Sequence, residues 1–236
     1  MHDPFIGGLR HALALQAGAT SFLHEYCLRT GFRSFDLTLP GSKRFLVLLE
    51  EEDRRCVLKD QWQSFPKNSP QLGIDLFFEE LLGRGIFGVD GPEWQHQRKM
   101  KSHLFSTLAM KQQMEHVFVT HGKKLVSILR QAAETKAVVD LQNIMQCFTF
   151  DATCEIVSGT NPGALEAASR GEKLEFLVSF DAAQAICFGR TVQPSMTTWN
   201  IFRWLNIGQE AEMQRHTRVL RDYVQAIIDS YKQSQH

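Results

Sequence analysis

The feature that most constrains the fold is a succession of helical patterns from residue 50 to the end of the chain. Apolar residues recur there at the three- and four-residue spacing of one helix face. A stop sequence, Gly159 followed by Asn161-Pro162-Gly163, separates two of these patterns. The predicted helices cover residues 50–62, 92–105, 110–135, 139–158, 171–189 and 209–233, and residues 74–82 are expected to form a short apolar helix or a turn. This succession predicts a mainly α-helical fold.

The single β element that we expect lies near the N-terminus. Two strand-like runs, residues 35–39 and 44–49, flank a Pro-Gly-Ser turn at residues 40–42 and are predicted to pair as an antiparallel hairpin. A further helix is expected over residues 18–30, where Gly31 ends it. A hairpin on its own is not stable in water, so it must pack against another part of the chain. The expected fold class is mainly α with a small β-hairpin.

The composition is that of an ordinary globular protein. Hydrophobic residues make up 43% of the 236 residues and charged residues 22%, which excludes a disordered or low-complexity chain. The 26 basic residues equal the 26 acidic ones, so the net charge gives no support to a nucleic-acid binder. No apolar run reaches the roughly 18 residues of a transmembrane helix, and the start lacks the pattern of a secretory signal.

The balanced total conceals one basic segment. Residues 94–136 contain eight Lys or Arg and two Glu, a net charge of +6. A basic surface on an otherwise neutral-to-acidic chain suggests docking to a negatively charged partner. A solvated helix face without a partner is the alternative explanation.

Common catalytic motifs are absent from the chain. There is no glycine-rich dinucleotide or phosphate loop, no H-E-x-x-H and no G-x-S-x-G. The five cysteines are an odd number and are scattered, which is typical of free thiols in a reducing compartment. Cys147 and Cys154 share a helix face, but no cluster of Cys and His has the spacing of a metal site. Buried structural thiols are favoured over metal ligands.

The most informative segment is residues 83–106, GRGIFGVDGPEWQHQRKMKSHLFS. Trp94 and Arg98 are four residues apart on its predicted helix, so they project from the same side. An indole N–H and a guanidinium on one face can both donate to one carboxylate group, and the planar guanidinium binds both of its oxygens. A buried Trp covered by the stem of an Arg is the alternative for this pair alone. Met100 is expected to face the core and Lys99 the solvent.

This segment closely resembles the helix C region of the cytochrome P450 haem-thiolate monooxygenases. In that family Gly-Ile-Phe precedes an Asp-Gly turn, W-x-x-x-R follows, and a basic pair and Phe-Ser end the motif. The segments FPKNSP, FTFDATCEIVSGTNPGAL and FDAAQAICFGR, with a later WNIFRWLNIGQEAE, occur in the order and spacing of the plant and fungal fatty-acid ω-hydroxylase branch. Together they extend over roughly residues 30–230. The resemblance implies the N-terminal half, the region of helices A to G, of the cytochrome P450 fold.

The resemblance also implies roles for individual residues. Trp94 and Arg98 would hydrogen-bond the propionates of a haem. Lys99 and His103 would lie on the face where the electron-donating reductase docks. Haem is the implied cofactor, and NADPH is implied indirectly through the reductase. The resemblance assigns no catalytic residue and no metal ligand to this chain.

Apolar residues are expected to surround the substrate channel. By resemblance, the loop before the Trp94 helix would lie over the distal face of the haem, and the helices near residues 176–188 would roof the channel. The expected lining residues are Ile86, Phe87, Phe176, Phe180, Ile186 and Phe188. Apolar walls select a long hydrocarbon by the area that they bury. A carboxylate head group would need a cation, for which Arg190 is the nearest candidate, unless Arg190 only ends its helix favourably.

The chain also departs from the family. A complete member is much longer and carries a central oxygen-activating helix, an E-x-x-R helix and a loop with the Cys thiolate ligand. None of these is present, and no cysteine here has the F-x-x-G-x-R-x-C-x-G context. We therefore expect residues 1–236 to form one truncated cytochrome P450 domain without its N-terminal membrane anchor.

The expected function is that of a fragment of a haem-thiolate monooxygenase, inactive alone. The complete enzyme would hydroxylate fatty acids or similar long-chain lipids with O2 and reductase-delivered electrons, on the cytosolic face of the endoplasmic reticulum membrane. The alternative is a non-catalytic helical interaction protein, or the product of a pseudogene, derived from the same fold.

Overall fold

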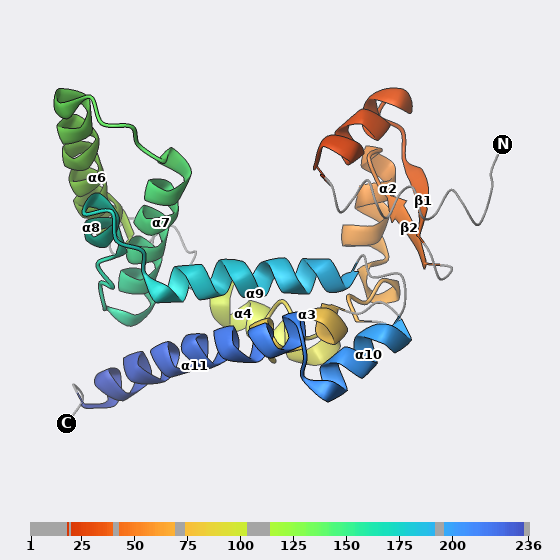
Figure 1. The fold of residues 1–236 in the computed structure, drawn as a ribbon. Coiled ribbons are helices and arrows are strands. Elements are labelled where there is room, and N and C mark those ends of the chain that lie inside the picture. Colours follow the sequence, from red (N-terminus) through yellow and green to blue (C-terminus); the bar gives the residue numbers. More distant parts are fainter. Residues whose placement is uncertain are drawn as a thin grey trace. The chain divides into compact units, whose positions relative to one another are not determined.

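The computed structural model describes residues 18, 20–39, 43–68, 74–102, 114–191 and 196–233. Within these ranges it is mainly helical, with one two-stranded antiparallel sheet (Figure 1). The expected fold class, mainly α with a small β-hairpin, is confirmed. The expected turn at residues 40–42 and His103 lie outside the described residues. Of the helices in the described ranges, none is both long enough and apolar enough to cross a membrane.

Most of the helices lie where the sequence patterns predict them. The helical elements are α2 (Glu51–Arg55), a π-helical turn (Cys56–Asp60), a 3-10 turn (Trp62–Ser64), α3 (Ile74–Leu82), α4 (Gly91–Ser102), α6 (Glu115–Thr135), α7 (Leu141–Ser158), α8 (Ala164–Ser169), α9 (Glu175–Thr191), α10 (Met196–Leu205) and α11 (Gln209–Gln233). The pattern over residues 50–62 predicts one helix, but the structure divides it into three short elements. The short helices α8 and α10 are not among the predicted ones.

The two ends of α7 show why its sequence signals are effective. The Asp140 side chain accepts a hydrogen bond from the backbone N–H of Asn143 at 3.0 Å and so caps the first turn. At the other end Gly159 has a φ of +70°, a left-handed conformation that glycine adopts without strain. Its N–H donates to the Glu155 carbonyl at 2.9 Å. The predicted stop at Gly159 is confirmed.

The hairpin pairs β1 (Phe35–Leu39) with β2 (Lys43–Val47) in an antiparallel arrangement. A helix over residues 20–29 precedes it in the chain. The ring of Tyr26, on that helix, lies 5.0 Å from the ring of Phe35. The hairpin therefore packs against a helix, as its instability in isolation requires.

Contacts within the chain divide it into two compact units, which are described separately. Unit 1 consists of Met1–Gln95 and Ala183–Gln214, and unit 2 consists of His96–Ala182 and Arg215–His236. Each unit therefore joins segments that are distant in the sequence, and the divisions fall inside α4, α9 and α11. The expectation that residues 1–236 form one domain stays a prediction.

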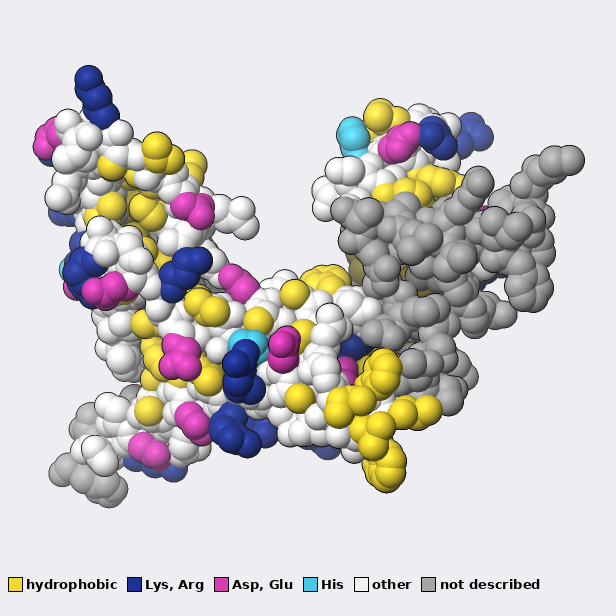
Figure 2. Space-filling view, in the orientation of Figure 1, with side chains coloured by type: hydrophobic (Ala, Val, Ile, Leu, Met, Phe, Trp, Pro, Cys, Tyr) yellow, Lys and Arg dark blue, Asp and Glu magenta, His cyan; other side chains and the backbone are white. Residues whose placement is uncertain are grey.

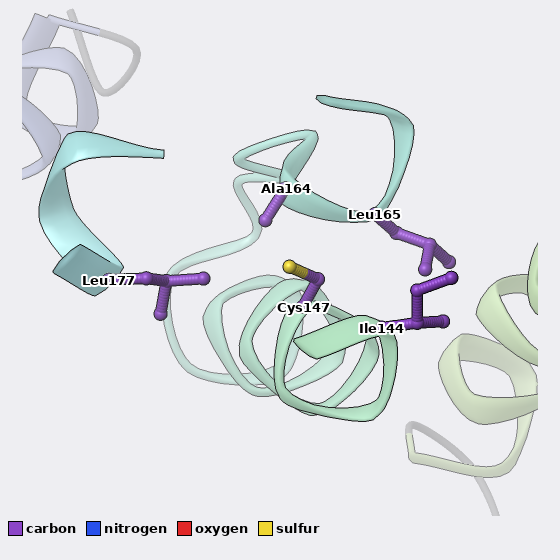
Figure 3. Packing of buried hydrophobic residues seen from close by; sticks show 5 residues of the cluster. All are labelled: Ile144, Cys147, Ala164, Leu165 and Leu177. Atoms are coloured by element: carbon purple, nitrogen blue, oxygen red, sulfur yellow. The ribbon is translucent and has the colours of Figure 1, made fainter. Parts of the chain in front are cut away.

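The core of unit 2 lies between α7, α8 and the start of α9 (Figure 3). Its buried members are Ile144, Cys147, Ala164, Leu165 and Leu177. The Cys147 thiol lies among these apolar side chains, and burial raises its pKa. Cys147 is thus a buried thiol, as favoured from the sequence, and so is Cys187. For Cys27, Cys56 and Cys154 the expectation of a buried thiol is wrong, because these three are only partly buried.

A buried carboxylate holds the start of α8. Asp151, on α7, accepts hydrogen bonds from the N–H groups of Ala164 and Leu165, each at 2.8 Å. The first N–H groups of a helix have no acceptor within the helix, and a carboxylate there also interacts favourably with the helix dipole. The position of α8 therefore depends on a side chain that comes from another helix.

Candidate functional site

The segment before α4 is held by hydrogen bonds from two consecutive residues. The Nζ of Lys67 donates to the Ile86 carbonyl at 2.9 Å, and the side-chain amide of Asn68 donates to the Gly88 carbonyl at 2.8 Å. The backbone N–H of Asn68 donates to the Asp90 carboxylate at 2.8 Å. These contacts, all within unit 1, fix the path of the chain into α4.

Helix α4 carries Trp94 and Arg98. The backbone N–H of Trp94 donates to the Asp90 carbonyl at 3.3 Å, and its ring lies 5.4 Å from the ring of Trp62. The Nζ of Lys67 is 5.6 Å from the centroid of the Trp94 ring. Trp94 is half-buried and Arg98 is exposed. Because the two residues are one helical turn apart, their side chains project from the same side of α4.

This pair has the chemistry to bind carboxylates. The indole N–H is only a donor, and the guanidinium presents its donors in a planar fork that matches a carboxylate. Two such donors on one side of a helix fit the propionates of a haem, the cofactor that the sequence resemblance implies. The binding role of Trp94 and Arg98 itself stays a prediction.

Three of the described cysteines have thiols whose pKa is raised by burial. Cys187 is fully buried, and burial raises the pKa of its thiol to about 11, so the thiolate is scarce at neutral pH. Burial also raises the pKa of Cys147 and of Cys154, and the charge of Asp151 adds to the effect. Within the described ranges no three His, Cys, Asp or Glu side chains are arranged to hold a metal ion. The pair on α4 thus fits the propionates of a haem, whereas none of the described cysteines has the F-x-x-G-x-R-x-C-x-G context of the family's thiolate ligand.

Four of the expected channel residues lie in unit 1. Phe87 is 69% exposed and Phe188 is 57% exposed, so both rings are accessible to a ligand. The ring of Phe188 meets the ring of Phe78 edge to face, with centroids 5.6 Å apart. Ile86 is half-buried, whereas Ile186 is buried in the core of unit 1. The burial of Ile186 gives no support to its expected place on a channel wall.

The expected channel residues Phe176 and Phe180 lie in unit 2. Their rings stack with centroids 6.4 Å apart. The ring of Phe176 also lies 5.0 Å from that of Phe150 and 4.7 Å from that of Tyr223. The structure thus places the two residues in an aromatic cluster whose other members the sequence analysis did not identify.

The expected docking residues are described only in part. Lys99 on α4 is exposed, in agreement with its expected place in solvent, and His103 lies outside the described residues. Met100 is 55% exposed, so the expectation that it faces the core is wrong. No residue of α4 is buried. Polar and charged residues make up most of α4, so its few apolar residues do not form a continuous stripe.

Sequence reasoning missed a buried ion cluster around Arg190, which is 2% exposed. Its Nε and Nη2 donate to the Glu210 carboxylate at 3.1 and 2.6 Å. Its Nη1 donates to the Glu80 carboxylate at 2.8 Å and to the Phe77 carbonyl at 2.9 Å, and Nη2 also reaches Glu80 at 3.5 Å. All five N–H groups of the guanidinium are therefore used within the protein. The interpretation of Arg190 as the cation for a substrate carboxylate is wrong.

One local feature of the sequence favours the burial of Arg190. It follows the apolar run at residues 186–188, so the face that carries it was a candidate for the core. The partners gave no local signal, because Glu80 lies 110 positions before Arg190.

The described residues thus form a mainly helical protein with a small hairpin, whose α4 carries Trp94 and Arg98 one helical turn apart. The family model described as Cytochrome P450 matches residues 14–236. The chain therefore belongs to the cytochrome P450 family, and the resemblance seen in the sequence is confirmed.

Relatives of the chain come from several plants. Cytochrome P450 94B3 of Arabidopsis thaliana is 32% identical over 197 residues, which are 83% of this chain and 38% of the relative. Cytochrome P450 704B1 of the same plant is 32% identical over 207 residues, 87% of this chain and 38% of the relative. Cytochrome P450 704C1 of Pinus taeda is 27% identical over 238 residues, 99% of this chain and 44% of the relative. The chain thus spans about two fifths of the length of these curated relatives.

Proposed function

We propose that the chain forms part of a haem-thiolate monooxygenase that hydroxylates fatty acids or similar long-chain lipids. The observation that carries this proposal is the pair Trp94 and Arg98 on α4, in a chain of the cytochrome P450 family. A bound haem would supply the activation of O2, with electrons from NADPH delivered by a reductase. The residues of this chain would hold the cofactor and part of the substrate.

Arg98 and Trp94 would hold the haem through its propionates. The planar guanidinium of Arg98 can donate two parallel hydrogen bonds to a carboxylate, to which the Trp94 N–H adds one more. A hydrogen bond to a charged group contributes about 1.5–3 kcal/mol. The contacts of the Trp94 ring with Trp62 and Lys67 restrict the orientation of the indole N–H. Because no cysteine of this chain has the sequence context of the family's thiolate ligand, we also propose that the chain alone has no monooxygenase activity.

The accessible aromatic rings of unit 1 support a lipid substrate. Phe87 and Phe188 are both more than half exposed, and Ile86 adjoins Phe87. Burial of hydrocarbon against such side chains contributes about 25 cal/mol per Å² and discriminates little between chain lengths. The resemblance of these segments to the fatty-acid ω-hydroxylase branch supports the same substrate class. Phe180, in unit 2, is proposed as a further substrate contact.

The basic segment over residues 94–136 supports docking of a redox partner. Lys99 is exposed, and the segment has a net charge of +6. Complementary charge speeds the encounter with an acidic reductase surface. We include His103 of the same segment in this proposed surface, and we place the complete enzyme on the cytosolic face of the endoplasmic reticulum membrane.

Haemin binding by the 236-residue chain tests the proposed cofactor site. We expect haemin to bind, and its dimethyl ester to bind about tenfold more weakly or worse, because the ester lacks the charges that Arg98 recognises. Absorbance titration measures both affinities. After reduction and addition of carbon monoxide, the complex should lack the Soret band of a thiolate-ligated haem. A thiolate-type band, or equal binding of the ester, would contradict the proposal.

A non-catalytic helical interaction protein with the same fold is the second candidate. The exposed apolar side chains of α10 favour it, above all Trp204, which is 82% exposed. A chain that is folded by circular dichroism and binds no haemin would favour this candidate over the monooxygenase.

A further inference from the structure

The buried ion cluster joins four helices of unit 1. Arg190 comes from α9, Glu80 from α3, Glu210 from α11, and Trp199 and Arg203 from α10. The Nε1 of Trp199 donates to Oε1 of Glu210 at 3.0 Å, and Nη2 of Arg203 lies 3.1 Å from Oε1 of Glu80. Both guanidinium groups lie 5.5 Å from the centroid of the Trp199 ring. The cluster thus ties α3 to α10 and to the adjoining ends of α9 and α11.

The charges of this cluster are paired in the observed packing of the four helices. Burial alone would raise the pKa of Glu80, but the hydrogen bond and the charge of Arg190 outweigh it, and the pKa is lowered. Burial alone would lower the pKa of Arg190, but its hydrogen bonds to Glu210 and Glu80 outweigh it, and the pKa is raised. The Arg190–Glu80 pair therefore stays charged at neutral pH. Separation of Arg190 from Glu80 and Glu210 would leave a buried charge unpaired, which is strongly unfavourable.

Two aromatic rings are attached to the same cluster. Phe188 precedes Arg190 by two residues on α9, and Phe78 directly follows Phe77, whose carbonyl accepts a hydrogen bond from Arg190. The rings of Phe78 and Phe188 meet edge to face, with an interplanar angle of 90°. Arg190 is buried, whereas Phe188 is exposed. The buried guanidinium of Arg190 thus holds the backbone at Phe77, next to Phe78, while the Phe188 ring of the pair stays accessible to a ligand.

We propose that Arg190 is a positioning residue of the lipid site: through Glu80 and Glu210 it holds the Phe78–Phe188 ring pair, against which the hydrocarbon chain of the substrate packs. The inference rests on the proposed function and adds Phe78 to the expected substrate contacts. The ring pair offers apolar area to a hydrocarbon, and the guanidinium of Arg190 has no donor left for a carboxylate head group.

Binding of decanoic acid and of decan-1-ol to the 236-residue chain tests this role, because these ligands share a hydrocarbon chain and differ in charge. Isothermal titration calorimetry measures both affinities. We expect Arg190→Met to weaken both ligands by the same factor, about tenfold or more, since the ring pair is no longer held. Arg190→Lys keeps the charge without the planar fork, so its effect should be intermediate.

Variants of the ring pair and a matched arginine complete the test. Phe78→Ala and Phe188→Ala should each weaken both ligands, because each removes apolar contact area. Arg170→Met is the control, since Arg170 is exposed and pairs with Glu172 on the surface of unit 2. We expect this variant to bind both ligands as the unaltered chain does.

Hydrogen exchange separates positioning from general unfolding. Arg190→Met and the milder Glu80→Gln should both speed the exchange of the α3 amides and leave those of α7 unchanged. Faster exchange throughout the chain in both variants would contradict a positioning role and favour a general structural one.

The binding results have distinct consequences. A loss confined to decanoic acid would mean that Arg190 binds the head group, which overturns the inference. Unchanged affinity of Arg190→Met for both ligands would overturn the inference too. So would weaker binding by Arg190→Met combined with full affinity in both Phe78→Ala and Phe188→Ala. If the unaltered chain bound neither ligand, the proposed lipid substrate would be wrong, and the inference about Arg190 with it. The results for the variants, in contrast, test the inference alone and do not affect the proposed lipid substrate.

Discussion

Gly88 shows how a single residue constrains the approach to the candidate haem site. A Cβ at this position would lie 2.3 Å from the carbonyl oxygen of Gly83, which is backbone and cannot rotate away. Its own carbonyl accepts the hydrogen bond from the side chain of Asn68. Any side chain at residue 88 would therefore displace the loop that leads into α4.

The propionate role of the α4 pair can be tested one residue at a time. We expect Arg98→Ala to lower the haemin affinity of the chain by about 1.5–3 kcal/mol, because a charge-assisted contact is lost. Trp94→Phe should lower it less, because the ring stays and only a neutral donor is removed. Absorbance titration measures the affinities, with the exposed Arg130→Ala on α6 as the control. Equal affinity in Arg98→Ala and the unaltered chain would show that the pair is only structural.

At the scale of one element, α8 depends on a carboxylate from α7. Asp151→Ala would leave the N–H groups of Ala164 and Leu165 without acceptors, and each buried unsatisfied donor costs about 1–3 kcal/mol. We expect the α8 amides to exchange about thirtyfold faster or more, as measured by mass spectrometry. Asp140→Ala, which removes the exposed cap of α7, should cost about 1 kcal/mol and affect the first turn of α7 alone. Unchanged protection of α8 in Asp151→Ala would rule out this dependence.

The ion pair between α3 and α9 makes stability depend on pH. Burial alone would raise the pKa of Glu80, but Arg190 outweighs it and holds the pKa below its ordinary value of 4.5. A lowered folded-state pKa adds stability above about pH 4.5 that is lost as the pH falls through the folded value. Glu80→Gln should therefore lower the thermal unfolding midpoint near neutral pH, and the difference should shrink below about pH 4.5.

Circular dichroism melting curves over this pH range measure the difference. Glu172→Gln is the matched control, because Glu172 forms an exposed pair with Arg170 that solvent screens. Its midpoint should stay close to that of the unaltered chain at every pH. A pH-independent difference for Glu80→Gln would show that Glu80 contributes through packing rather than through its charge.

At the scale of the whole molecule, apolar side chains remain exposed over α10, where Figure 2 shows them gathered at the lower right. These residues are Ile201, Phe202, Trp204 and Leu205 of α10 and Ile207 in the segment that follows it. A contiguous apolar patch binds hydrophobic dyes and promotes association. We expect the chain to enhance the fluorescence of 1-anilinonaphthalene-8-sulfonate at neutral pH, and Trp204→Ser to reduce the enhancement. Val138→Ser, at an exposed site in unit 2, should change it little, and equal dye binding in all three proteins would exclude α10 as the source.

The sequence by itself determined the features whose signals are local. The patterns over residues 209–233 and 74–82 predict the bounds of α11 and α3, because apolar spacing and helix ends depend on neighbouring residues. The spacing of one helical turn singled out the pair Trp94 and Arg98, but its role at a haem came from the family resemblance and stays a prediction. The family resemblance also came from short contiguous segments, and the match over residues 14–236 confirms it.

Only the tertiary structure decided the features that depend on distant residues. Six residues are too few for a helix to be stable by propensity, so α8 could not be predicted without the Asp151 carboxylate that holds its start. Likewise, the local sequence around an arginine near a helix end does not show whether its side chain faces solvent or is buried. The packing of α3, α9 and α11 brings Glu80, 110 positions away in the sequence, and Glu210 to Arg190. Arg190 can be buried because these two carboxylates compensate its charge.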